Sequence, residues 1–155
     1  MKQRRVLRIT SQICALARST SVRQSREQEA AMAKGDDIRE RLVVFAGQVM
    51  DLCDELSKTP AGTHVAGQLL RCATSAAPNY AEARGAESSR DFVHKLGIVL
   101  KELNEAEVWI DILVRRRMAE GPQILQAQEE CKTLCRIIGA SVRTAGRNLS
   151  RLKDA

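Results

Sequence analysis

The chain has 155 residues, of which 44% are hydrophobic and 28% charged, the balance of an ordinary soluble globular protein. This length allows one domain with a substantial core and excludes two domains of comfortable size. No apolar run approaches the ~20 residues that a membrane-spanning helix needs. Few aromatic residues and a core built from Leu, Val, Ile and Ala favour helices over sheets.

The net charge of +6 is concentrated in the N-terminal segment. Residues 1–34 carry eight Lys/Arg and two Glu, whereas residues 35–155 carry seventeen residues of each sign. The segment is rich in Arg, Ser and Gln and lacks the sustained apolar run of a secretory signal. We expect a disordered basic extension, or a start assigned too far upstream with Met32 as the true first residue. An organelle transit peptide is a further interpretation, and residues 35–152 are expected to form the folded domain.

The first predicted helix covers residues 36–57. Its apolar residues recur at three- and four-residue intervals and form a stripe about 80° wide. Asp36 and Asp37 are expected to cap its N-terminus, and the segment SKTPAG is expected to end it. The residues of the stripe are Ile38, Leu42, Phe45, Val49, Leu52 and Leu56.

The second predicted helix begins near Ala61 or Thr63 and ends at Arg84, with Gly85 as the permissive residue after its end. Pro78 lies inside this helix, where it removes one backbone donor and predicts a kink. Thr74 or Ser75 is expected to satisfy part of the freed backbone. We expect Asn79 and Glu82 to tie the bend to a neighbouring helix or subunit. The predicted apolar positions are Val65, Leu69, Leu70, Cys72, Ala73 and Ala76.

The third predicted helix follows Ser88, which forms a near capping box with Asp91, and extends as far as Met118. Its stripe consists of Phe92, Leu96, Val99, Leu103, Ala106, Ile110 and Leu113. The fourth helix begins at Pro122. Its predicted buried face consists of Ile124, Cys131, Cys135, Ile138, Val142 and Leu149. Four amphipathic helices joined by short loops predict an all-α, antiparallel up-down four-helix bundle.

The cysteines predict neither a disulfide framework nor a zinc site, because their number is odd and no C-x-x-C pair occurs. They are expected to be buried thiols in a reducing cytoplasm. The five are Cys14, Cys53, Cys72, Cys131 and Cys135.

The sequence also lacks the motifs that catalysis or a bound cofactor would need. No Glu-x-x-His pair of the kind used by di-metal bundles occurs, and the single Asp91–His94 pair is interpreted as a helix-surface contact. Glu102, Glu105 and Glu107 are expected to form ion pairs with Lys101 or with residues of other helices. No catalytic residue, metal ligand or cofactor-binding residue is therefore predicted.

Two basic features are candidate nucleic-acid contacts. Arg115, Arg116 and Arg117 form a run at the end of the third helix, where cations also complement the helix dipole. A basic stripe lies beside the buried face of the fourth helix, and it is either a solvated surface or a phosphate-binding one. The stripe consists of Lys132, Arg136, Arg143, Arg147 and Arg151.

Residues 69–113 resemble the four-helix-bundle family of proteins encoded in intervening sequences of bacterial 23S rRNA genes. The family pattern expects Gly directly after Glu82, but this chain has Ala83 there and Gly85 two residues later. The resemblance extends over roughly residues 36–150. The matching residues are Ser75, Pro78, Asn79, Ala81, Glu82, Ser88 or Ser89, Phe92, His94 and Leu96.

The resemblance implies a helical bundle that assembles as a homo-oligomer, with a pentameric ring as the expected form, and it implies no catalytic residue. The leading hypothesis is a non-enzymatic, cytoplasmic, oligomeric interaction protein. The alternative is a basic-surface accessory factor that binds RNA or DNA, for example beside a reverse transcriptase, as related retroelement bundles do. A membrane partner is not expected.

Overall fold

The structure, a computed structural model, describes residues 35–56 and 58–151. The chain divides into two units between Ile38 and Arg39. Residues 35–38 are helical within the first unit. The predicted domain boundary between residues 34 and 35 remains a prediction, and most of the basic extension lies outside the described residues.

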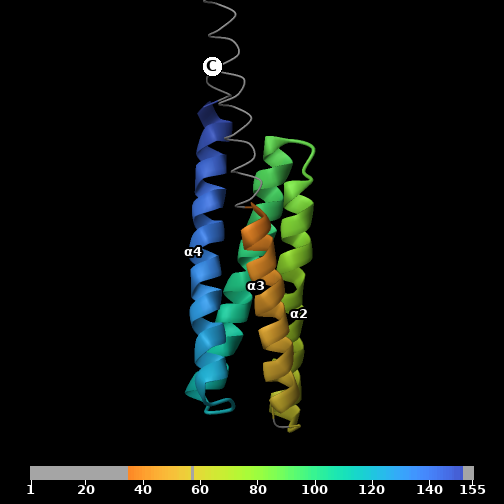
Figure 1. Ribbon diagram of the computed structural model, residues 1–155, viewed down its shortest axis with the longest axis vertical. Coiled ribbons are helices and arrows are strands. Elements are labelled where there is room, and N and C mark those ends of the chain that lie inside the picture. The colour runs from red at the N-terminus through yellow and green to blue at the C-terminus, as the bar shows by residue number, and fades with distance from the viewer. Residues whose placement is uncertain (1–34, 57, 152–155) are drawn as a thin grey trace, which may run out of the picture. The chain divides into compact units, whose positions relative to one another are not determined.

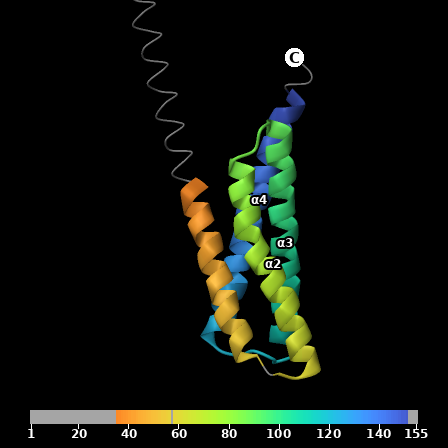
Figure 2. The ribbon, with the colours of Figure 1, turned by 90° about the vertical axis from the view of Figure 1, so that its right-hand side faces the viewer.

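The second unit is a bundle of helices. Its first helix covers residues 39–55, and three labelled helices follow: α2 (Pro60–Arg84), α3 (Ser89–Arg115) and α4 (Pro122–Arg151). Successive helices run side by side in opposite directions, and α3 packs against both α2 and α4 (Figures 1 and 2). No strand occurs among the described residues. The all-α bundle predicted from the apolar periodicity is therefore confirmed.

The core contains the apolar stripes of the four helices and, among the described residues, no buried polar or charged side chain. On α4 the prediction was partly wrong, because Cys135, Val142 and Leu149 are only half-buried whereas Ala127 and Leu134 are buried. The largest fully buried side chains are Phe45, Leu42, Leu69, Leu96, Leu103, Ile110, Leu113, Ile124, Leu134, Ile138, Val49 and Val99.

Two predicted helix starts were wrong. Residue 35 is already helical, so Asp36 and Asp37 lie within a helix and do not cap it. The second helix begins at Pro60, ahead of the predicted start, because the Thr59 hydroxyl accepts a hydrogen bond from the Gly62 amide at 3.1 Å. Pro60 suits the first helical position, where no backbone donor is needed.

The corner between α2 and α3 does not contain a left-handed glycine. Gly85 caps α2 with φ of −90°, which is a right-handed conformation that any residue can adopt. The expected cap of α3 is present, since the Ser88 hydroxyl accepts from the Asp91 amide at 3.1 Å. The corner therefore depends on the Ser88 cap and does not use the conformational freedom of Gly85.

Gly85→Ala is expected to leave stability unchanged or raise it by about 0.4–1 kcal/mol, because alanine restricts the unfolded chain. A Cβ at residue 85 would have its nearest contact at 3.7 Å, an ordinary van der Waals distance. Gly121→Ala is the matched control, because Gly121 has φ of +100° and a side chain there is strained. It should lower the free energy of unfolding by roughly 1 kcal/mol in urea titrations. Equal effects of the two substitutions would contradict this account.

Helix α3 ends at Arg115, and the predicted extension to Met118 was wrong. Arg117 adopts the left-handed conformation with φ of 52°. The Arg117 amide donates to the Val114 carbonyl at 3.1 Å, and the Met118 amide donates to the Leu113 carbonyl at 2.9 Å. This pair of hydrogen bonds is the Schellman motif, which here has arginine at the position that glycine usually occupies.

Within the described residues, no helix combines the length and the apolar character that crossing a bilayer requires.

Candidate interaction surfaces

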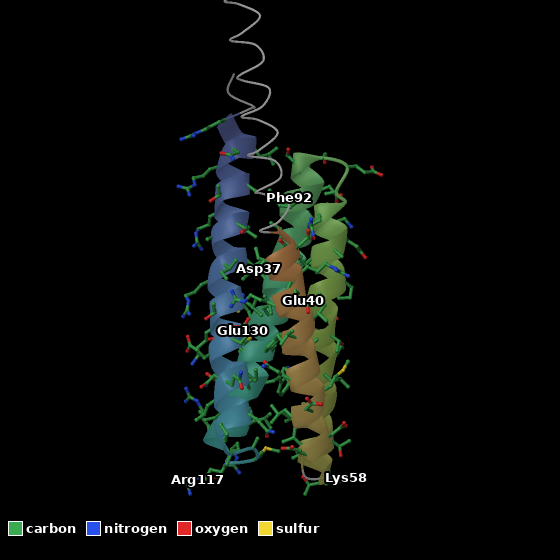
Figure 3. All side chains as sticks on the ribbon, in the orientation of Figure 1. Asp37, Glu40, Lys58, Phe92, Arg117 and Glu130 are labelled. Atoms are coloured by element: carbon green, nitrogen blue, oxygen red, sulfur yellow. The ribbon has the colours of Figure 1, made fainter. Side chains whose placement is uncertain are left out.

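The basic stripe of the fourth helix lies on the outward side of α4. We call Lys132, Arg136, Arg143, Arg147 and Arg151 the cationic face. Its four arginines are exposed and Lys132 is half-buried. Nitrogen-tipped side chains project outward along α4 (Figure 3). Because the core-facing residues occupy the opposite side of the helix, the stripe is free to contact a partner.

The cationic face has almost no compensating negative charge. Residues 131–151 contain five Lys/Arg and no Asp or Glu. Within the described residues, one ion pair involves this face, between Arg136 and Glu129 at 3.2 Å. Both side chains of that pair are more than 60% exposed, with values of 66% and 69%, so the pair contributes little. The stripe is therefore a concentrated positive surface on a domain whose charges sum to zero overall.

The second basic feature lies at the other end of the bundle. Arg115, Arg116 and Arg117 are exposed at the turn between α3 and α4, and Figure 3 shows Arg117 beyond the lower end of the helices. Arg147 is 25 residues beyond the start of α4 at Pro122, or about 38 Å along the helix. The structure therefore does not bring the two basic features together.

Sequence reasoning did not single out two further exposed cations. Arg90 and Lys101 of α3 are exposed. A Cβ on Gly139 would lie 3.9 Å from the side chain of Leu100, which places this part of α3 level with the middle of α4. Arg90 and Lys101 are three helical turns apart and share one outward side of α3. That spacing is the sequence signal that could have identified them.

The stretch around Pro78 is part of an uninterrupted helix, since α2 continues from Pro60 to Arg84. The Asn79 side chain donates to the Ser75 carbonyl at 2.8 Å, so it supports its own helix and does not reach the neighbouring one. Glu82 behaves as expected, because its carboxylate accepts from Lys95 of α3 at 2.9 Å. These contacts give the stretch a structural role within the bundle.

The hydroxyls of this stretch satisfy carbonyls one turn earlier. Thr74 donates to the Leu70 carbonyl at 2.7 Å, and Ser75 donates to the Arg71 carbonyl at 2.8 Å. Neither hydroxyl reaches the Thr74 carbonyl, which is the acceptor that Pro78 leaves without a helical donor. Of the remaining signature residues, Phe92 is half-buried, and His94 is exposed on α3.

One side of α2 presents a surface without charge. Between Pro60 and Ala81, Arg71 is the single Lys, Arg, Asp or Glu, and its guanidinium is turned to Glu105 of α3. Leu70, which the sequence placed with the core, is instead 36% exposed. The uncharged residues recur at three- and four-residue intervals, so they form one stripe along the helix. They are Thr63, Gly67, Leu70, Thr74, Ala77 and Ala81.

The adjacent side of the first helix adds two exposed apolar residues, Val43 and Met50. They are flanked on the same side by the exposed Arg39 and Asp54. Val43 is 46% exposed and Met50 is 47% exposed. Cys53 donates to the Ala66 carbonyl at 3.6 Å, which shows that these two residues lie level on the antiparallel helices. One turn from that contact, Met50 lies level with Leu70. We call the uncharged stripe of α2 together with Val43 and Met50 the neutral face.

Two of the three α3 carboxylates that were expected to form ion pairs, Glu102 and Glu105, lie beside the same arginine. Glu105 pairs with Arg71, and Glu102 lies 3.8 Å from the same guanidinium. Glu105 also accepts from the Trp109 indole at 3.5 Å, and Trp109 forms an edge contact with His64 at a centroid distance of 5.9 Å. Hydrogen bonding to Glu105 raises the pKa of Arg71. This cluster joins α2 to α3, as the prediction of interhelical ion pairing expected.

The described part of the chain holds no group of three or more His, Cys, Asp or Glu residues that could bind a metal ion. Its four cysteines are free thiols, and Cys131 donates to the Leu103 carbonyl at 3.4 Å within the core. Burial raises the pKa of Cys53 and of Cys72 to about 11. The hydrogen bond to Cys135 raises the pKa of Cys131. Cys14 lies outside the described residues.

The raised thiol pKa values predict that stability decreases in alkaline solution. Between about pH 9 and pH 11 the unfolded Cys72 thiol loses its proton while the folded thiol retains it. The stability that the neutral thiol contributes is therefore present below pH 9 and is lost as pH rises through the folded pKa. The free energy of unfolding should fall by up to about 1.4 kcal/mol per pH unit for each such thiol. In Cys72→Ala this slope should be smaller, and an unchanged slope would contradict the prediction.

The comparisons with known proteins agree with this architecture. The chain is similar to a protein of unknown function from Bacteroides thetaiotaomicron VPI-5482, whose crystal structure describes it as a member of the S23 ribosomal protein family. The two share 27% identity and a TM-score of 0.65. The match covers 71% of this chain and 98% of the other. No curated protein matches the chain. The model of the family described as 23S rRNA-intervening sequence protein matches residues 36–140, a segment that ends before Arg143. The chain therefore belongs to the 23S rRNA-intervening sequence protein family.

Proposed function

We propose that this protein is a non-enzymatic helical bundle that assembles with copies of itself and serves as an interaction module. The observation that carries this proposal is the neutral face, where Leu70 and Met50 are exposed side by side. Removing this face from water would stabilise an assembly, because apolar burial is the main driving force of association. The free cysteines fit a protein of the reducing cytoplasm.

The size of the neutral face fits a second copy of this chain as its occupant. From Thr63 to Ala81 the face is about 27 Å long. On α2 it is about 10 Å wide along that whole length, and on the first helix it extends only from Val43 to Met50, about 10 Å. It therefore offers roughly 400 Å² on each partner and about 800 Å² in total. This total is near the lower limit for a specific interface. A Cβ on Gly67 would meet nothing within 4 Å, so another helix can approach closely there.

A closed ring is the expected assembly, with the homo-pentamer that the family resemblance implies as its form. A ring requires that the neutral face pack on a different surface of the next copy, because a face that packs on itself gives a dimer. Mass measurement by light scattering at micromolar concentration tests the proposal. A single mass near 17.1 kDa, the mass of one chain, would reject it.

The cationic face favours a second candidate function, the binding of RNA or DNA as an accessory factor. Five cations without a carboxylate among residues 131–151 form a surface suited to phosphate groups. Single-strand platforms stack bases on aromatic side chains, and no Phe, Tyr or Trp occurs in this segment. The expected contact is therefore to the phosphate backbone, without base recognition. Retention of nucleic acid at low salt and its loss at high salt test this function.

A further inference from the structure

A groove lies between the helix of residues 39–55 and the first half of α4. Its larger hollow has a volume of about 430 Å³, and a smaller one of about 60 Å³ adjoins it, since Gln48 and Gln126 line both. The two walls come from neighbouring helices, which carry Glu40 and Glu130 (Figure 3). The larger volume falls in the range of small-molecule sites. Neither proposed function uses this groove.

The groove contains a hydrogen-bond acceptor without a donor. The Oε1 atom of Gln48 is buried and has no hydrogen-bond partner. A buried polar atom without a partner costs about 1–3 kcal/mol, so native structures rarely retain one without a reason. Because the Gln48 side chain lines both hollows, rotation of its amide would turn the oxygen toward a donor placed in the groove. The amide oxygen requires that the occupant present an N–H or O–H group.

The charges of the groove select a cation. Four carboxylates and one guanidinium line its two hollows, which leaves a net charge of −3. Arg41 is held by Glu130 through two hydrogen bonds of 2.9 Å, so its charge is neutralised within the wall. Glu40, Asp51 and Glu129 are exposed. Glu129 also contacts Arg136, but both of those side chains are largely in solvent.

The shape of the groove selects a long and partly apolar cation. The side chain of Val44 is 49% exposed on the wall. Glu40 and Asp51 are eleven residues apart on one helix, or about 16 Å. A compact metal ion cannot contact both ends, whereas a chain of methylene groups with several ammonium groups can. Methylene groups would cover Val44, and ammonium groups would meet the carboxylates and the Gln48 oxygen.

We propose that this groove binds a linear aliphatic polyamine. Spermine is the probe for the experiment, and putrescine is the short control, because putrescine cannot span the distance from Glu40 to Asp51. Titration calorimetry on the full chain at low ionic strength should give one spermine per chain. Spermine should bind at least about tenfold more tightly than putrescine, because putrescine reaches fewer of the carboxylates.

Gln48→Leu separates binding from folding. It removes an acceptor that is unpaired in the free protein, so the denaturant midpoint of the free protein should stay the same or rise. Spermine affinity should fall about tenfold, because a hydrogen bond to a charged donor is lost. Glu129→Gln should also weaken binding. Glu87→Gln removes an exposed carboxylate outside the groove and is expected to leave affinity unchanged.

Several outcomes would overturn the proposal. Equal affinity for spermine in the natural protein and in Gln48→Leu would show that the amide oxygen meets only water. Equal losses of spermine affinity in Glu87→Gln and Glu129→Gln would show that spermine is attracted by the overall charge of the protein and does not bind at a specific site. Absence of any binding heat, together with an unchanged thermal midpoint in spermine, would reject the site directly.

Discussion

Substitution of Leu70 and Met50 together by glutamate is expected to convert the assembled protein into monomers. The two side chains lie level on adjacent helices and are 36% and 47% exposed in the single chain. In an assembly each glutamate would have to bury a charge without a partner, which costs several kcal/mol. Tenfold weaker association corresponds to about 1.4 kcal/mol, so two such charges suffice for dissociation at micromolar concentration.

Light scattering measures the mass, and circular dichroism checks that each variant keeps its helices. Leu125→Glu is the matched control, because Leu125 is 57% exposed on α4, away from the neutral face. It introduces the same charge on a leucine of greater exposure and should leave the assembly intact if α4 does not carry the surface that receives the neutral face. An assembly that survives the double substitution, or one that only Leu125→Glu dissociates, contradicts the proposed interface.

Reversal of charge at Arg136, Arg143 and Arg147 is expected to abolish retention of RNA and DNA. These residues are exposed along one side of α4, and glutamate there would repel the phosphates that arginine attracts. If all five cations of the cationic face contact duplex phosphates, the logarithm of the binding constant should fall with log salt at a slope near −4.5. The triple substitution should remove both the binding and its salt dependence.

Substitution of Arg115, Arg116 and Arg117 by glutamate provides the control for this experiment. It changes the same number of charges by the same amount at the opposite end of the bundle. If the cationic face is the binding surface, this variant should keep most of its affinity. Absence of salt-sensitive binding in the natural protein would reject the nucleic-acid-binding function. Loss of binding only in the control variant would place the binding surface at Arg115–Arg117 instead of the cationic face.

Local patterns in the sequence were sufficient to predict those features of the fold that depend only on residues close together in the chain. The heptad-like spacing of residues such as Leu103 and Ile110 placed them in the core, since a helix buries one stripe. Ser88 identified the start of α3, because capping is a local hydrogen bond. Pro122 likewise marked the start of α4. Such signals need no knowledge of what lies across the bundle.

Predictions from the sequence were wrong where two local arrangements fit the sequence equally well and only the tertiary structure distinguishes them. Gly85 was identified as the permissive residue after α2 but has φ of −90°, whereas Arg117 adopts the left-handed conformation at the end of α3. Asn79 was expected to tie the bend to a neighbouring helix or subunit, and within this chain its amide bonds to the Ser75 carbonyl of its own helix. On α4, Leu134 occupies the core position that the pattern also allowed for Cys135. Helical periodicity tolerates a rotation of some tens of degrees, and only packing fixes it.

The sequence by itself determined that the chain is a helical bundle, which helices it contains and which family it resembles. Apolar spacing and caps carry that information residue by residue. Only the tertiary structure decided that Leu70 lies beside Met50 on an uncharged surface and that Gln48 is part of a groove with α4. Each of these pairs brings together residues from different helices. The register of one helix against the other depends on how the core side chains interlock. The candidate surfaces are therefore properties of the packed bundle.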